Sequence, residues 1–242
     1  MSESRGVPVI WCPLYEVDIG RHVFPMEKYR LIKERLEAEG ALAGAQLRSP
    51  EAASEEDVLR VHAPAYWQKV LDGDFTASEE RLLEIPFSDA VREAFLLSAG
   101  GTTLAGRLAL SHGRAVHLGG GFHHAFADHG EGFCLLNDVA IAAASLVAEG
   151  VVERIAIVDL DVHHGNGTAA IFADDARIFT FSMHHQWNYP AIKPAGDLDV
   201  GLEDGVGDEG VLGPPHGASS ARSGRSPASA HHLPGWSRPL RG

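Results

Sequence analysis

Cysteine, apolar runs and a secretory leader are all scarce or missing in this sequence. Its 242 residues include two cysteines, Cys12 and Cys134, too few for a disulfide framework, so a reducing compartment is the simplest interpretation. No apolar stretch approaches the ~20 residues that cross a bilayer. Residues 1–5 lack the basic-then-apolar pattern of a secretory signal. We therefore expect a cytoplasmic protein without a membrane partner.

Basic residues are also few. The chain has 20 Lys and Arg against 33 Asp and Glu, which gives a formal net charge of −13. Nucleic-acid binding depends on Lys and Arg that neutralise phosphates, so no direct nucleic-acid partner is expected. The negative charge would suit a cationic partner, although a solvated acidic surface is the commoner explanation.

Acidic residues are absent from the end of the chain. All 33 lie within residues 1–209, whereas the last 33 residues hold six Gly, six Ser and five Pro and show no periodicity. Such a composition cannot bury enough apolar area to offset the entropy of ordering. We predict a folded domain over residues 1–209 and a low-complexity tail over residues 210–242. The tail is either disordered or translated out of frame.

Residues 1–209 alternate between apolar strand-like runs and helical patterns. Strands are expected at 7–11, 115–118, 154–162 and 178–183, and helices at 26–39, 64–71, 88–110, 138–149 and 168–172. The alternation predicts an α/β fold with a parallel sheet, and the apolar run 154–162 favours a strand covered on both faces. In such sheets, functional residues gather at the carboxyl ends of strands.

The strongest local signal is an Asp-x-His pair at the end of the expected strand 154–162. Asp161 and His163 are two residues apart, so their side chains leave the same face. A carboxylate oxygen and an imidazole nitrogen on one face are plausible ligands for Zn²⁺. Asp159 shares that face and could orient a neighbouring group. The alternative is a set of polar residues that cap the strand end and the next helix.

A second constellation places two histidines after three glycines. Gly119–Gly121 let the backbone turn tightly, and His123 and His124 follow. A phosphate cradle competes with this interpretation, but neither G-x-G-x-x-G nor a P-loop lysine is present. Adjacent histidines rarely chelate one ion together, yet they could contact two atoms of one reacting group. Asp138, further along, is expected to cap the next helix.

Two long motifs closely resemble the histone deacetylase superfamily, which includes acetylpolyamine amidohydrolases and acetoin-utilisation proteins. They are GGGFHHA…GEGFCLLNDVAIA and IVDLDVHHGNGT, continued by SMHHQWNYP…GDLDVGLEDGVGD. FPMEKYRLI fits the bacterial and eleventh-type-deacetylase-like branch. The resemblance covers residues 8–209 and implies a three-layer arginase/deacetylase-like fold, a parallel sheet with helices on both faces, incomplete at the C-terminus. Residues 1–209 would then be the N-terminal portion of a deacetylase-like catalytic domain.

The resemblance also implies roles for the two constellations. Asp161 and His163 match zinc ligands. His124 matches the general base and acid, and His123 matches the histidine that hydrogen-bonds the attacking water and stabilises developing charge. Asp159 fits the partner of His123.

Further positions match supporting parts of the family site. Asn166 stands beside His124 where some branches have Asp. Gly132 and Phe133 correspond to the tunnel that grips the acyl-lysine stem. Ser182 and Met183 match a structural monovalent-cation site, which would hold K⁺.

Two family parts have no counterpart in the sequence. A third zinc ligand, an Asp in a G-A-D context, and a catalytic Tyr are expected beyond residue 210, where the chain has neither Asp nor Tyr. The resemblance implies hydrolysis of an N-acetyl amide, carried by an acetyl-lysine peptide or protein or by an acetylpolyamine, with one zinc ion per chain. Without these two parts the chain is expected to be inactive. The alternative is a non-catalytic truncated remnant or binding module of the same fold; an arginase-type ureohydrolase would require further Asp-rich motifs.

Overall fold

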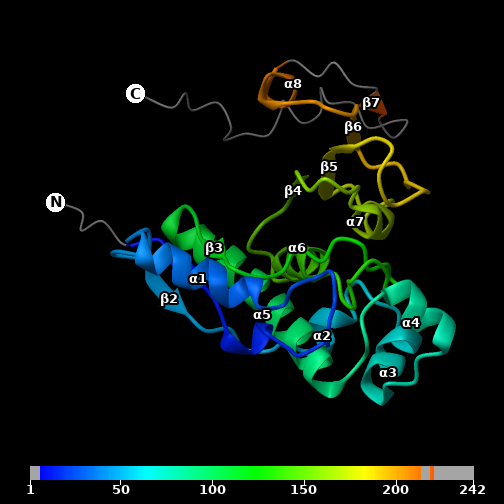
Figure 1. The fold of residues 1–242 in the computed structure, drawn as a ribbon, viewed down its shortest axis with the longest axis horizontal. Helices are drawn as coiled ribbons and strands as arrows, with labels where there is room; N and C mark the ends of the chain where they lie inside the picture. The colour runs from blue at the N-terminus through cyan, green and yellow to red at the C-terminus, as the bar shows by residue number, and fades with distance from the viewer. Residues whose placement is uncertain (1–5, 214–218, 221–242) are drawn as a thin grey trace. The chain divides into compact units, whose positions relative to one another are not determined.

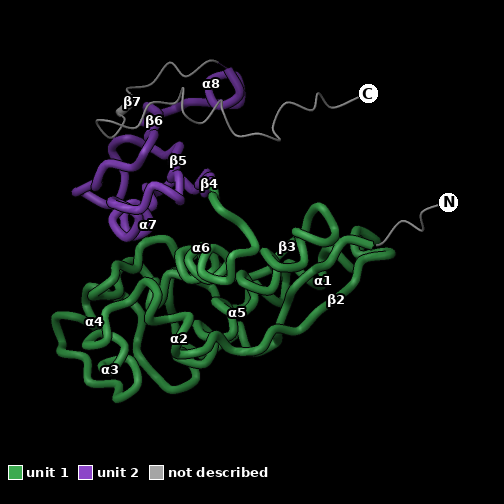
Figure 2. Tube along the Cα trace, turned by 180° about the vertical axis from the view of Figure 1, so that it is seen from behind, with its two compact units in different colours: residues 1–155 green, residues 156–242 purple. Residues whose placement is uncertain are grey.

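The computed structural model describes residues 6–213 and 219–220. The chain divides into two compact units, residues 1–155 (unit 1) and residues 156–242 (unit 2), coloured separately in Figure 2. A three-stranded sheet belongs to unit 1, and a four-stranded sheet runs from the boundary through unit 2 (Figure 1).

The sheet of unit 1 is parallel throughout. Its strands are β1 (Pro8–Ile10), β2 (Gln46–Arg48) and β3 (Val116–His117), in the order β2-β1-β3. The central strand β1 is buried, as its apolar sequence PVI predicts. Because β3 ends at His117, the glycine turn and the two histidines follow directly from the carboxyl edge of this sheet.

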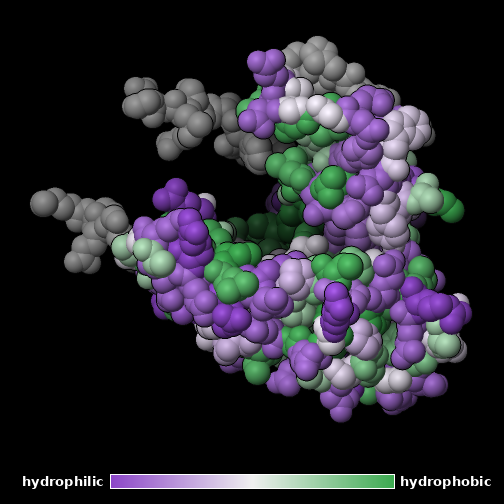
Figure 3. All heavy atoms as spheres, in the orientation of Figure 1, coloured by the Kyte–Doolittle hydropathy of each residue, from purple (hydrophilic) through white to green (hydrophobic). Residues whose placement is uncertain are grey.

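Helices make up most of the rest of unit 1. They are η1 (Pro13–Tyr15), α1 (Lys28–Ala38), α2 (Glu55–Val58), α3 (Pro64–Asp72), α4 (Ala77–Leu83), α5 (Asp89–His112) and α6 (Asp138–Ala148). The long helix α5 packs against both α6 and β1. Over these helices, the face drawn in Figure 3 is mostly hydrophilic with scattered apolar residues. Among the described residues, no helix is both long and apolar enough to cross a membrane.

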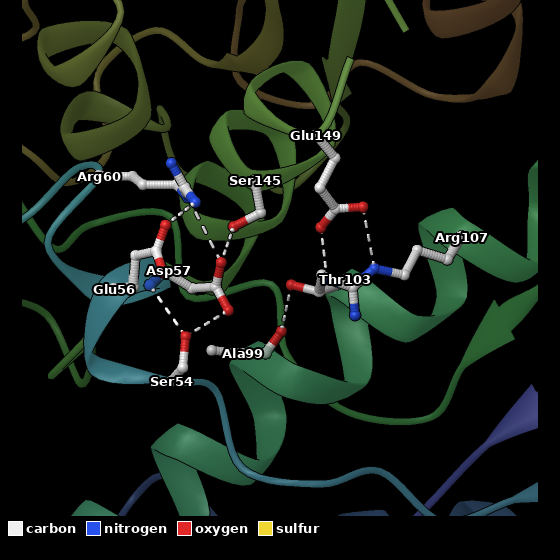
Figure 4. Close-up of polar contacts among 9 residues, drawn as sticks. All are labelled: Ser54, Glu56, Asp57, Arg60, Ala99, Thr103, Arg107, Ser145 and Glu149. Atoms are coloured by element: carbon white, nitrogen blue, oxygen red, sulfur yellow. Dashed lines mark hydrogen bonds and ion pairs between the residues drawn. The ribbon is translucent and has the colours of Figure 1, made fainter. Parts of the chain in front are cut away.

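Polar contacts fix α6 against its neighbours (Figure 4). Ser145 on α6 donates to Asp57 Oδ1 on α2 at 2.9 Å. One turn further along, at the C-terminal cap of α6, both carboxylate oxygens of Glu149 accept from Arg107 on α5. These contacts fix the C-terminal end of α6 against α2 and α5.

The second sheet has the order β4-β5-β6-β7. Its strands are β4 (Ile155–Asp159), β5 (Ile178–His185), β6 (Leu198–Leu202) and β7 (Ser219–Ser220), accompanied by α7 (Asn166–Ile171) and α8 (Asp208–Leu212). β5 and β6 are parallel, and β7 is antiparallel to β6. Of the predicted tail, residues 210–212 end α8 and residues 219–220 form β7; most of the remainder lies outside the described residues.

The predicted α/β class, with parallel strands and helices, is confirmed. The strand predicted at 154–162 is present as β4, but it ends at Asp159, and the expectation that it is covered on both faces is wrong, because Val158 is 59% and Leu160 is 68% exposed. Beyond β4 the chain turns, because the Asp159 carboxylate accepts from Asp161 N at 3.0 Å and the Asp161 carboxylate accepts from His163 N at 2.7 Å. Such side-chain-to-backbone bonds compete with strand pairing.

His62 makes the stability of unit 1 depend on pH. Its side chain is buried, and Nε2 accepts from Asn137 N at 3.1 Å, which requires a neutral ring. Burial lowers the pKa of His62 to about 4 from 6.5. At pH values between 4 and 6.5, His62 binds a proton in the unfolded chain but stays neutral in the folded chain. The free energy of unfolding should therefore fall as pH drops from 6.5 to 4, by about 1.4 kcal/mol per pH unit for this group.

Urea unfolding at several pH values measures this slope. His62→Gln keeps an acceptor but does not titrate, so its slope between pH 6.5 and 4 should be flatter than that of the wild type. His129 serves as the control because its pKa is raised by Glu131 and by Asp128, and that titration lies above the window. Equal slopes for His62→Gln and the wild type would contradict the prediction.

Candidate active site

The glycine turn brings the chain from β3 into the histidine pair. Gly120 and Gly121 have φ of +73° and +82°, values that side chains other than glycine rarely adopt. A Cβ at Gly120 would lie 2.2 Å from Asp138 Oδ2 and 2.9 Å from Thr102 Oγ1. Gly120 is therefore required both for the backbone conformation and for the close approach of Asp138.

His123 and His124 are buried side by side after this turn. The two residues are 8% and 5% exposed. Their ring centroids lie 4.1 Å apart, and the ring planes are tilted by 48°. The backbone N–H of His123 donates to Gly121 O at 3.0 Å, which keeps the turn tight. Two imidazoles held together away from bulk water can contact neighbouring atoms of one bound group, the arrangement that general acid–base chemistry needs.

The end of this loop differs from the prediction, because Asn137 and not Asp138 caps α6. Asn137 has an extended backbone and accepts from Ala140 N at 3.0 Å, while its Nδ2 donates to Ala125 O at 3.1 Å. Asp138 is the first residue of the helix and its carboxylate binds the glycine turn instead. The physical reason is that a carboxylate at the start of a helix can accept a hydrogen bond from any nearby N–H group, and here the N–H groups of the glycine turn lie within reach.

Gly132 and Phe133, the predicted tunnel residues, lie in a strained turn. Their φ values are +54° and +68°, and their backbone N–H groups donate to Leu82 O and Leu83 O at the end of α4. A non-glycine residue in this region costs free energy, so the surrounding structure must hold Phe133 there.

Phe133 packs against two aromatic rings that the sequence analysis did not identify. The His22 centroid lies 5.2 Å away at 89°, and the Phe24 centroid 5.5 Å away. Phe24 also lines an open hollow of ≈ 660 Å³ with Glu16 and Asp18. The signal was present, since Phe24 begins the FPMEKYRLI motif, but the contact with Phe133 spans more than 100 residues.

The predicted zinc ligands form a compact pair in unit 2. His163 Nδ1 lies 3.0 Å from Asp161 Oδ1, and the two side chains are 37% and 51% exposed. Two donors of one tetrahedral zinc ion lie about 3.3–3.5 Å apart, so the pair fits that metal with little movement. Within the described residues, no group of three or more His, Cys, Asp and Glu is placed to hold a metal ion.

Asn166 is 2% exposed at the start of α7, and its N–H donates to His164 O at 2.8 Å. With Asp159 at the end of β4, it belongs to unit 2, whereas His123 and His124 belong to unit 1. The structure therefore brings together two groups of predicted residues, each within its own unit.

Ser182 and Met183 lie on β5 beside a buried cluster that the sequence analysis missed. Ser182 Oγ is 2.9 Å from His184 Nδ1, and the His184 ring lies 4.6 Å from that of His164. His164 Nε2 is in turn 3.3 Å from Asp199 Oδ1. Burial, with the neighbouring His164, lowers the pKa of His184 to about 4. Polar residues at alternate positions along β5 were the sequence signal that could have indicated this cluster.

The structure combines parallel strands and helices with two motifs, a buried histidine pair after a glycine turn and an Asp-x-His turn at a strand end. These features define a protein of the α/β class with hydrolase-like motifs. Comparison with known families is decisive: the histone deacetylase domain matches residues 22–216. The chain belongs to the histone deacetylase family.

Known relatives agree with this assignment. The chain is 43% identical over 208 residues to an uncharacterized protein of Picosynechococcus sp., covering 86% of this chain and 69% of that one. It is 32% identical to the histone deacetylase-like amidohydrolase of Pseudomonas aeruginosa, over 77% of this chain and 50% of that one. The acetoin utilization protein AcuC of Bacillus subtilis is 31% identical, over 76% and 51%. The chain thus spans about half the length of the latter two.

A solved structure shows the same fold. The HD domain of HDA15 superimposes with a TM-score of 0.64 at 24% identity, covering 78% of this chain and 57% of that domain. At this identity the match supports the fold class and not the details of the site.

Proposed function

We propose that the protein is a zinc-dependent deacylase that hydrolyses an N-acyl amide. The observation that carries this proposal is the presence of two family motifs in one chain. One is the buried His123–His124 pair after the glycine turn, and the other is the Asp161–His163 pair, whose donor atoms lie 3.0 Å apart. Both motifs lie within the residues that the histone deacetylase domain matches.

Each residue has a distinct task in this proposal. Asp161 and His163 would hold the zinc ion, which polarises an amide carbonyl and lowers the pKa of a water molecule. His124 takes the proton from the attacking water and delivers it to the leaving amine. His123 donates a hydrogen bond to the oxygen on which negative charge develops, the kind of preorganised donor that contributes much of the rate enhancement in acyl transfer. Asp159 orients His123.

The proposed substrate is an acylated amine on a cationic carrier, either a lysine-containing peptide or a polyamine. Phe133 offers an apolar ring for the methylene stem, and His22 and Phe24 extend that aromatic surface. Glu16 and Asp18 line the adjacent hollow. With a net charge of −13, the chain attracts positively charged ligands over a longer range.

A non-catalytic role is the second candidate, and one observation favours it. A catalytic zinc usually has three protein ligands, and within the described residues no group of three or more His, Cys, Asp and Glu is placed to hold a metal ion. Residues 210–242 contain no Asp and no Tyr, the residue types expected for the third ligand and the catalytic Tyr.

Zinc affinity tests the proposal directly. The 242-residue chain should lose zinc on dialysis, because affinity depends on ligand number and geometry. Replacing the residues after Glu209 with the corresponding segment of the Picosynechococcus relative should restore retention. In that grafted chain His163→Ala should weaken binding more than about tenfold, since loss of partners that only orient the ligands already costs that much.

Competition with a chromophoric chelator measures these affinities. His129→Ala, a partly exposed histidine on unit 1 outside the motifs, serves as the control and should bind zinc normally. Stoichiometric zinc that survives a mild chelator in the ungrafted chain would contradict the prediction. His184 or Asp199 would then be the first substitute ligands to examine.

A further inference from the structure

A chain of hydrogen bonds runs beneath the glycine turn and joins four elements of unit 1. Tyr15 Oη on η1 is 2.8 Å from His117 Nε2 on β3. His117 Nδ1 is 2.9 Å from Thr102 Oγ1 on α5, and Thr102 donates to Asp138 Oδ2 on α6. Tyr15 and Asp138, the two ends of the chain, are buried. Asp138 lies within the motif GGGFHHA…GEGFCLLNDVAIA, but none of these four residues has a catalytic or metal-binding role in the proposed chemistry.

The direction of every bond follows from the acceptor at its end. A carboxylate only accepts, so Thr102 uses its single proton on Asp138 and must itself accept from His117 Nδ1–H. Burial lowers the pKa of His117, which favours the neutral ring. A neutral ring protonated on Nδ1 has an unprotonated Nε2, which accepts from Tyr15 Oη.

The other hydrogen bonds of Asp138 go to the glycine turn. Its carboxylate accepts from Gly121 N at 3.1 Å and from Phe122 N at 2.7 Å. It also lies in the first turn of α6, an 11-residue helix whose dipole favours a negative charge there. The packing leaves no spare room: a Cβ at Gly101 would lie 2.5 Å from both His117 Nε2 and Tyr15 Oη.

We propose that Asp138 is a positioning residue for the His123–His124 pair. Its carboxylate, oriented by Thr102, holds the two peptide N–H groups that immediately precede His123, and so fixes where both rings begin. The inference rests on the acid–base role proposed above for the histidines. Without that acceptor the N–H groups of Phe122, which is buried, and of Gly121, which is exposed, lose their partner, and the turn must move to satisfy the buried one.

Amide hydrogen exchange in the 242-residue chain tests the geometric half of the proposal. In Asp138→Asn an amide NH₂ replaces one accepting oxygen, and in Thr102→Val the orienting hydroxyl is lost. Both variants should exchange the Gly121 and Phe122 amides at least about tenfold faster, with unchanged protection in the middle of α5. Thr102→Ser keeps the hydroxyl and should restore slow exchange.

Thr103→Val is the matched control. Thr103 is the next residue on α5; it is buried, whereas Thr102 is half-buried, and it donates to Ala99 O within its own helix. Faster exchange at Gly121 in this control, or exchange that rises equally across α5 in every variant, would show general loosening and overturn the proposal. ¹⁵N chemical shifts should also show His117 protonated on Nδ1 in the wild type; the opposite tautomer would overturn the bond directions.

Kinetics of the grafted chain test the functional half. Asp138→Asn and Thr102→Val should lower kcat about 10- to 100-fold for an acetyl-lysine peptide, because displacement of catalytic groups by about 1 Å has effects of that size. KM should change less than about twofold, and Thr102→Ser should recover kcat. An active grafted chain with unchanged kcat in Asp138→Asn would overturn the positioning role. A grafted wild type that binds zinc and cleaves nothing would instead refute the deacylase function, and the exchange data would decide the positioning of the turn.

Discussion

Hydrolysis of an acetyl-lysine peptide by the 242-residue chain should be no faster than hydrolysis by its His124→Ala variant. Within the described residues, no group of three or more His, Cys, Asp and Glu is placed to hold a metal ion, and the sequence after Glu209 contains no Asp and no Tyr. Loss of a single oxyanion donor costs about 10²–10³ in kcat, and here a metal ligand and a donor are both expected to be missing.

The grafted chain should behave differently. With residues after Glu209 taken from the 43% identical Picosynechococcus relative, we expect zinc-dependent deacylation. His124→Ala in that background should lower kcat by about 10²–10⁴, the usual contribution of a positioned acid–base group. His129→Ala is the matched control and should keep full activity.

Two results would contradict this reasoning in different places. Robust activity of the ungrafted chain that His124→Ala removes would show that the interpretation of residues 210–242 is wrong. A grafted chain that retains zinc but cleaves neither acetyl-lysine peptides nor acetylpolyamines would refute the deacylase assignment itself.

Gly120→Ala should destabilise unit 1 far more than Gly121→Ala does. Both positions have positive φ, which costs an alanine about 1–2 kcal/mol. At Gly120 the new Cβ would also lie 2.2 Å from Asp138 Oδ2, whereas at Gly121 nothing lies within 4 Å. Overpacking of this kind adds about 1–3 kcal/mol, so the expected total for Gly120→Ala is about 2–5 kcal/mol.

Urea unfolding followed by the fluorescence of Trp11 and Trp67 compares the two variants. Gly121→Ala is the internal control because it shares the backbone strain and the loop but lacks the overlap. Equal losses of stability would mean that the carboxylate of Asp138 moves aside without cost. That result would also weaken its proposed role beneath the histidine pair.

Some of the structure follows from short stretches of sequence. Ser88 caps α5 by accepting from Val91 N at 3.2 Å, and Gly113 ends the helix with φ of +79°, as local patterns predict. The turn after β4 is equally local, because Asp161 binds the backbone and ring of His163 two residues away. The family motifs themselves are contiguous, so a single sequence was enough to recognise them.

The tertiary structure alone decided which partner each polar side chain binds. Asp138 was expected to cap its own helix, yet its carboxylate serves Thr102 and a turn about 17 residues earlier in the chain. The same holds for His164 and Asp199, which meet across 35 residues. A residue type fixes how many hydrogen bonds a group can make, but only packing fixes which donors reach it. For this reason the sequence determined the family and the candidate chemical groups, and the fold determined how those groups are held.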